Sequence, residues 1–375
     1  MNKHKNKISG MLGEFLKKCK SSSQLNKTGI EITAENTSTD RDQTIEKYGK
    51  LSIDFEVPPL DLRTLSGVIW DDSRSDSIGE SHGASGDYKE YNDIQYIGNG
   101  IFNYTNGSAN TALKELVFPE GSTFGPSVFS GCNALESIIF EGDATITSGG
   151  CFSYLPELKS LVFKGESNIT SGAFWDTTKL ESITFGEKTN IGSGVLYYPS
   201  SPNTALKELV FPEDSTFGSV VFSYCNALES VTFEGDIQLT SGGCFMGLSA
   251  LKSIDFKGES VLASGAFMNC LAIESITFGG KTEVRGGIFY YSETQPNTGI
   301  KELVFPEGSV FPQSCFSYLY GLEKLVFEGD VDITAGGCFY KLPGLKSVEF
   351  KGTSKIGQST FNGCGKLKTI VFADA

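Results

Sequence analysis

Hydrophobic and polar positions alternate along most of this chain in short segments that recur at a nearly constant interval. Each segment reads Leu or Ile, two variable residues, an apolar residue, one variable residue and Phe, as in residues 135–140 (LESIIF). Such alternation, with many β-branched and aromatic side chains, is typical of a half-buried β-strand. The sequence therefore predicts twelve strands of one design. They close at Phe118, Phe140, Phe163, Phe185, Phe211, Phe233, Phe256, Phe278, Phe305, Phe327, Phe350 and Phe372.

The spacing of these phenylalanines defines a repeat. Successive gaps are 22, 23, 22, 26, 22, 23, 22, 27, 22, 23 and 22 residues, so a block of four repeats recurs after 93 and then 94 residues. Each repeat also carries a second apolar step that ends in Phe in most copies, such as residues 169–174 (ITSGAF). A single repeat of this length cannot bury its own apolar face, so neighbouring repeats must stack. We therefore predict a repeat solenoid over residues 113–375, with one parallel strand per 22–23-residue turn. Turns and short irregular or helical segments are expected on its other face.

The residues before the solenoid divide into three parts. Residues 51–112 hold weaker copies of the repeat and a polar insertion, which predicts degenerate capping repeats. Residues 20–50 are rich in Ser, Thr, Asn and Lys, which is typical of a flexible polar linker. Residues 1–19 are short, basic and amphipathic, and residues 8–19 are the only stretch in which we expect membrane contact. Such a segment either lies on a membrane surface, docks to a partner or forms a tail, and the sequence leaves these alternatives open.

The layout of the repeat resembles the BspA-like leucine-rich repeats, also called leucine-rich repeat type 5. Residues 264–271 (SGAFMNCL) and 359–367 (STFNGCGKL) carry the Phe-x-x-Cys step of that family. The resemblance covers residues 113–375. It implies a leucine-rich-repeat solenoid that binds other macromolecules, in a protein that is secreted or displayed at a cell surface. No signal peptide or transmembrane segment is legible, because the apolar stretch from Ile8 to Leu16 is interrupted by Glu14.

Composition and charge argue against several classes of function. A formal net charge of −14 argues against nucleic acid as a partner, because phosphate binding requires clustered Lys and Arg. The two histidines, His4 and His82, fall in no catalytic motif, and the cysteines follow the repeat rather than the close pairs of a zinc site. We therefore expect no enzyme activity, no metal and no cofactor. The expected function is binding of a protein partner of unknown identity, by adhesion to host or bacterial surface molecules. The alternative is an intracellular interaction scaffold or effector.

The outward strand positions form the candidate binding surface. The position after the first Leu or Ile alternates between Lys and Glu through eleven repeats, from Lys114 to Lys346. This alternation predicts a ladder of ion pairs that sets the register of stacked turns rather than attracting a charged ligand. Other outward positions are small or β-branched and predict a smooth, mildly apolar stripe that suits a protein partner. The candidate binding residues are Val117, Ser137, Val162, Ser182, Val210, Ser230, Ser253, Ser275 and Val304.

The last predicted strand ends at Phe372, three residues before the end of the given sequence and without a polar cap. An uncovered edge strand can pair with a strand of another chain. We therefore expect either end-to-end self-association at the C-terminal edge or continuation of the solenoid in a longer protein.

Overall fold

The computed structural model describes residues 114–373, apart from 125–126, 148, 199–201 and 290, together with four short strands nearer the N-terminus. Those strands are β1 (Leu60–Asp61), β2 (Gly67–Trp70), β3 (Tyr88–Tyr91) and β4 (Tyr96–Ile97). β2 and β3 pair antiparallel, whereas β1 and β4 each pair parallel with a strand of the solenoid. The remaining residues before 114 lie outside the described part, so the segments 1–19, 20–50 and 51–112 stay predictions.

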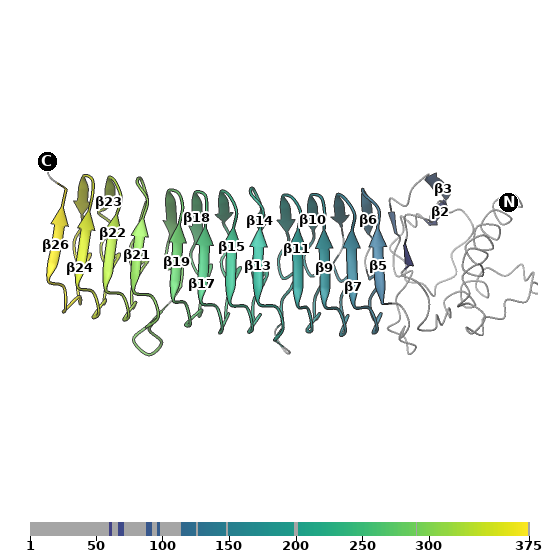
Figure 1. The fold of residues 1–375 in the computed structure, drawn as a ribbon, viewed down its shortest axis with the longest axis horizontal. Coiled ribbons are helices and arrows are strands. Elements are labelled where there is room, and N and C mark those ends of the chain that lie inside the picture. Colours follow the sequence, from purple (N-terminus) through teal and green to yellow (C-terminus); the bar gives the residue numbers. More distant parts are fainter. Residues whose placement is uncertain are drawn as a thin grey trace, which may run out of the picture.

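The twelve predicted strands are present, and each ends at its expected phenylalanine. Their alternate residues point into the solenoid, as the pattern of residues 137–140 shows, where Ile138 and Phe140 are buried. They lie parallel and in register in one row along a straight rod (Figure 1). These strands are β5 (Glu115–Phe118), β7 (Ser137–Phe140), β9 (Ser160–Phe163), β11 (Ser182–Phe185), β13 (Glu208–Phe211), β15 (Ser230–Phe233), β17 (Ser253–Phe256), β19 (Ser275–Phe278), β21 (Glu302–Phe305), β22 (Lys324–Phe327), β24 (Ser347–Phe350) and β26 (Thr369–Phe372).

A second row of parallel strands, which the sequence did not predict, runs along the face behind this row and divides into a nine-stranded sheet that includes β4 and a separate pair, β23 and β25. Most of its strands have three residues, and a typical one such as Ser167–Ile169 buries both ends around an exposed centre. Its strands are β6 (Ser122–Phe124), β8 (Ala144–Ile146), β10 (Ser167–Ile169), β12 (Thr189–Ile191), β14 (Thr216–Phe217), β16 (Ile237–Leu239), β18 (Ser260–Ala263), β20 (Thr282–Arg285), β23 (Val331–Ile333) and β25 (Ser354–Ile356). Tight turns make the third side of the described solenoid, and no helix occurs there.

Two columns of phenylalanine fill the interior. The strand-ending rings stack on one another from turn to turn, as Phe140 does on Phe163 with ring centres 4.6 Å apart and planes 3° apart. The rings of the third side form a second column, in which Phe129 stacks on Phe152 at 5.3 Å. Rings of the two columns meet edge to face, which is a favourable geometry for aromatic quadrupoles. The Phe-rich repeat therefore supplies one continuous core along the rod.

The front sheet is interrupted at both borders between four-repeat blocks. β11 and β13 are not joined by a ladder of hydrogen bonds, nor are β19 and β21, so the row divides into sheets of five, four and four strands, with β1 in the first. These borders coincide with the 26- and 27-residue repeats. The core continues across them, because Phe185 still stacks on Phe211 at 5.4 Å and Phe278 on Phe305 at 5.1 Å. The longer repeats therefore loosen the backbone pairing without dividing the solenoid.

Candidate functional site

The outward face of the front sheet carries the candidate binding residues. Val210 is 37% exposed, and Val304, Ser182 and Ser275 are exposed as well. Four other candidates are partly buried, namely Ser137, Val162, Ser230 and Ser253.

The prediction was wrong for Val117. Only 6% of this residue is exposed, and Asp61 of β1 lies opposite it in the register of the pair β1–β5. β5 is therefore not a free edge of the sheet. Val117 does not belong to the accessible surface.

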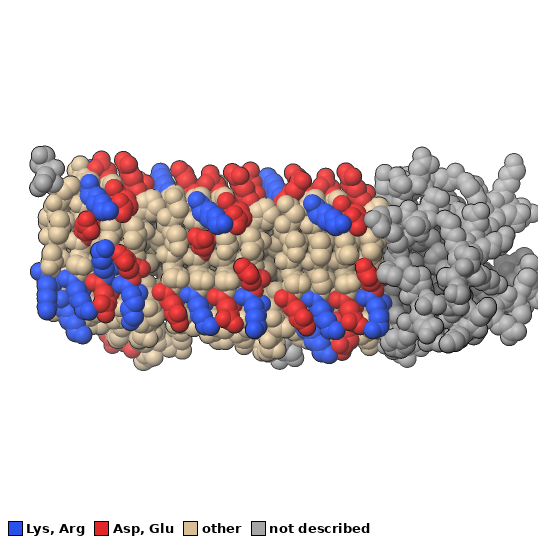
Figure 2. Space-filling model, in the orientation of Figure 1, with Lys and Arg blue, Asp and Glu red and all other residues tan. Residues whose placement is uncertain are grey.

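The predicted ladder of ion pairs runs along the base of the same face, where Figure 2 shows blue and red side chains alternating. The Glu136 carboxylate accepts from Lys114 Nζ at 2.6 Å and from Lys159 Nζ at 2.9 Å. These hydrogen bonds lower the pKa of Glu136 to about 2. The contact recurs between Lys252 and Glu229 (2.8 Å) and between Lys346 and Glu323 (2.6 Å). At these positions the ladder is confirmed, and its charges are matched within the chain.

A second row of charge lies at the corner between the two sheets, in the motif Glu-Gly-Asp. Glu234 pairs with Lys257 of the next turn at 2.7 Å, and Asp236 Oδ1 accepts from the backbone N–H of Glu259 at 2.7 Å. The same two kinds of contact recur in the other blocks. In the first block Glu141 pairs with a lysine and Asp143 accepts from a backbone N–H of the next turn, and in the third block Glu328 and Asp330 do the same. These carboxylates cross-link successive turns, which leaves them poorly suited to holding a cation.

A concavity of about 470 Å³ opens on the outward face at the border between β11 and β13. Its apolar floor includes Phe185 and Val210, and Glu213 and Glu234 stand at its rim. Among the strand-ending phenylalanines before the last strand, Phe185 is the one that is partly rather than fully buried. The remaining lining residues are Ile183, Thr184, Gly186 and Pro212. The recess thus lies where the pairing of the two strands is interrupted.

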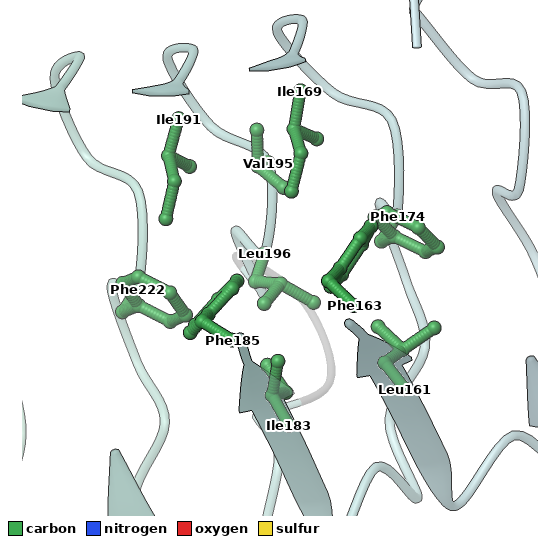
Figure 3. Close-up of a pocket in the computed structure, with 10 residues that line it drawn as sticks. All are labelled: Leu161, Phe163, Ile169, Phe174, Ile183, Phe185, Ile191, Val195, Leu196 and Phe222. Carbon is green, nitrogen blue, oxygen red and sulfur yellow. The ribbon is translucent and has the colours of Figure 1, made fainter. Parts of the chain in front are cut away.

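The packing beneath this recess is loose for a reason visible in the sequence. In the third-side column, Leu196 stands between Phe174 and Phe222, at a position where its neighbours in the stack have a ring. The side chains of Leu196, Phe174, Phe185 and Phe222 converge around a cavity of about 10 Å³ (Figure 3). Every lining residue is apolar. A space of this size holds about one water at most, so it is a packing gap and not a ligand site.

A row of exposed aromatic side chains on the third side was not predicted. Tyr154 is 47% exposed and Trp175 41%, and their ring centres lie 5.6 Å apart. Tyr197 and Tyr224 form a second pair at 6.1 Å. The signal in the sequence is the triplet Phe-Ser-Tyr, which recurs at residues 152–154, 222–224 and 316–318. Exposed Tyr and Trp are enriched at protein interfaces, so this row is a second candidate contact surface.

The cysteines of the described solenoid occupy core positions. Burial raises the pKa of Cys132, Cys244 and Cys270 to about 12, so these thiols are protonated and poorly nucleophilic near neutral pH. Across the described residues, no cluster of three or more His, Cys, Asp and Glu side chains could hold a metal ion. His4 and His82 lie outside that part of the chain. No helix within it is long and apolar enough to span a bilayer.

Comparisons with solved structures return leucine-rich-repeat proteins. A leucine-rich repeat protein from Bacteroides ovatus is 21% identical with a TM-score of 0.43, and the match covers 75% of this chain and 64% of that one. A leucine rich cell surface protein from Faecalibacterium prausnitzii is 16% identical with a TM-score of 0.28, covering 79% and 86%. The pneumococcal vaccine antigen PcpA is 15% identical with a TM-score of 0.29, covering 78% and 90%. This chain thus spans less than two thirds of the Bacteroides protein.

No curated protein matches the sequence. The sequence model of the BspA type Leucine rich repeat region (6 copies) matches residues 89–203, 201–295 and 296–375. These ranges include every strand of both sheets from β4 onward. The chain therefore belongs to the BspA type leucine-rich-repeat family.

Proposed function

We propose that this chain is a non-catalytic protein-binding module whose outward face holds a partner at the concavity between β11 and β13. The observation that carries the proposal is a recess of about 470 Å³ with an apolar floor on the outward face of the sheet. Binding energy at protein interfaces concentrates where an apolar anchor enters a desolvated pocket. Phe185 and Val210 supply such a floor in this chain.

The rim of the recess favours a partner of a particular charge. Glu213 is exposed there, whereas Glu234 is already paired with Lys257, and the whole chain carries a formal net charge of −14. A carboxylate such as Glu213 beside an apolar floor favours an apolar side chain flanked by Lys or Arg, and it repels acidic competitors. The smooth stripe of Ser and Val on neighbouring strands would extend the contact along the rod.

The binding proposal is tested with the substitution Val210→Asp in the full chain. A carboxylate at the floor of the recess would have to be desolvated on binding, so we expect at least about tenfold weaker capture of the partner. The measurement is the amount of each protein retained from a lysate by the immobilised variant and by the original chain. Gln238→Asp, at an exposed position of the rear sheet, is the matched control and should retain the partner. Equal capture by the original chain and Val210→Asp would refute the assignment of the recess.

Adhesion at a cell surface is the role that family membership supports, and an intracellular scaffold or effector is the alternative. The two differ in where the protein acts. Fractionation of cells that produce the tagged full chain, with protease treatment of intact cells, separates them. For adhesion, we expect the protease to remove the tagged protein from the surface of intact cells. Protein found wholly in the cytosol would exclude adhesion and leave the scaffold.

We also propose that the exposed edge of β26 pairs either with a second copy of the chain or with a further turn of a longer protein. Each of its four residues is exposed, including Ile370, Val371 and Phe372, and β24 is its single partner in the sheet. An apolar strand with unpaired backbone groups is a template for further strand pairing.

A further inference from the structure

Two cysteines of the third block lie one above the other in consecutive turns. Cys315 and Cys338 are both buried, and they immediately precede Phe316 and Phe339. Those two rings stack with centres 5.7 Å apart and planes 9° apart. The backbone N–H of Phe316 donates to the carbonyl of Cys338 at 2.9 Å, which fixes the register of the two turns. Cys315 and Cys338 are therefore stacked neighbours.

The separation of stacked neighbours suits a disulfide. Adjacent parallel chains lie about 4.8 Å apart, and bridged cysteines have Cα atoms about 4.4–6.8 Å apart. Cys338 Sγ donates to the carbonyl of Pro312 at 3.0 Å, three residues before Cys315, so its thiol lies against the preceding turn.

The block repeat shows that this arrangement is particular to the third block. Cys338 corresponds to Cys151 and Cys244, which stand at the same place in the first two blocks. Cys315, in contrast, corresponds to Val128 and Val221. The first two blocks therefore place a thiol over a valine, where no bond can form. In the third block a thiol lies over a thiol.

We propose that Cys315 and Cys338 form a disulfide under oxidising conditions and so fasten two turns of the third block together. With a peroxide as oxidant, one sulfur attacks the O–O bond, which yields a sulfenic acid and water. The second sulfur then displaces the hydroxyl from that sulfenic sulfur, which forms the S–S bond and releases a second water. The two sulfurs lose two electrons in total, which reduce the peroxide, and the two thiol protons leave in the water molecules.

Burial controls how quickly the bond forms. Desolvation raises the pKa of Cys315, whereas the side chain of Cys315 lowers the pKa of Cys338, and neither sulfur is open to solvent. Oxidation of the folded chain is therefore slow and proceeds through local opening of the turns, whereas oxidation during folding is fast. The same burial protects the finished bond from reductants. The bond closes a 23-residue segment, which opposes separation of these turns.

The experiment uses the full chain and hydrogen peroxide in two arms, one on folded protein and one during refolding from urea. Free thiols are then alkylated, and the digest is examined by mass spectrometry. We expect a peptide that links residues 315 and 338, two hydrogens lighter than its parts, with a higher yield in the refolding arm. The oxidised chain should also melt several degrees above the reduced chain.

Cys315→Val is the matched variant, because valine occupies this position in the other two blocks. It should fold, lack the linked peptide and melt at the same temperature with or without peroxide. Full alkylation of Cys315 and Cys338 in both arms would overturn the proposal. Linkage of Cys338 to several other cysteines in equal amounts would overturn it as well.

Discussion

At the scale of single residues, glycine at the corners of each turn allows successive turns to approach closely. A Cβ atom on Gly258 would lie 2.5 Å from both the backbone nitrogen and the side-chain Oδ1 of Asp236 in the turn before it. That nitrogen belongs to the backbone, which cannot move aside without disturbing the stack. The Asp236 carboxylate there also accepts from the N–H of Glu259. Absence of a side chain at residue 258 is thus a requirement of the repeat.

We predict that Gly258→Ala lowers the free energy of unfolding by about 1–3 kcal/mol, because the added methyl group is forced against backbone atoms. Urea unfolding followed by circular dichroism measures the change. Gly365→Ala is the control, since a Cβ there would meet no atom within 4 Å. It should leave stability unchanged or raise it by up to about 1 kcal/mol. Equal effects of the two substitutions would contradict this account of the corner.

At the scale of the element, a buried asparagine stands at each border where backbone pairing of the front sheet is lost. The side chain of Asn203 is fully buried at the first border. Its Nδ2 donates to the Leu180 carbonyl at 2.9 Å and its Oδ1 accepts from the Leu206 N–H at 2.9 Å. Asn297 makes equivalent contacts at the second border, with the carbonyl of Ile273 and the N–H of Ile300. Each border is therefore held by one buried amide side chain in place of a strand ladder.

The two borders differ at one core position, which allows a reciprocal test. Leu196 at the first border corresponds to Phe289 at the second, and the cavity of about 10 Å³ is lined by Leu196. We predict that Leu196→Phe stabilises the chain by about 0.5–2 kcal/mol by filling the gap. Phe289→Leu should destabilise it by about 1–2 kcal/mol. Urea unfolding midpoints measure both changes. A loss of stability in both variants would mean that the first border cannot accept a ring.

Sequence patterns located these elements well, because their causes are local. The alternation of residues 135–140 and its equivalents correctly predicted the twelve strands of the front sheet from β5 to β26. The rear strands were missed, since a segment such as Ser167–Ile169 is too short for its alternation to stand out. Burial of Val117 was missed because its alternation with Leu116 and Phe118 predicts an outward side chain, whereas all three residues are buried. The binding role of the remaining candidate residues stays a prediction.

At the scale of the whole molecule, β26 is the last strand of the described rod, and β24 is its single partner in the sheet (Figure 1). Phe372 of this strand stacks on Phe350 with ring centres 5.3 Å apart and is 54% exposed. Either a second copy of the chain or a further turn of a longer protein would bury this ring and pair with the backbone of β26.

We predict concentration-dependent self-association of the full chain that Phe372→Lys abolishes, because a charged side chain at the edge opposes strand pairing. Analytical ultracentrifugation over a range of concentrations measures it. Val304→Lys, on the outward face in the middle of the rod, is the control and should associate like the original chain. A monomer at every concentration would contradict pairing through β26.

The sequence by itself determined the architecture of this protein. A period of two within strands, a period of 22–23 residues between them and a phenylalanine at each strand end admit few arrangements other than stacked parallel turns. The tertiary structure alone decided the features that depend on contact between residues of different turns. These include the recess at Phe185 and Val210, the aromatic pair Tyr154–Trp175 and the stacked cysteines Cys315 and Cys338. The recess lies at the border made by the 26-residue repeat, and the two pairs depend on which side chains stack one turn apart.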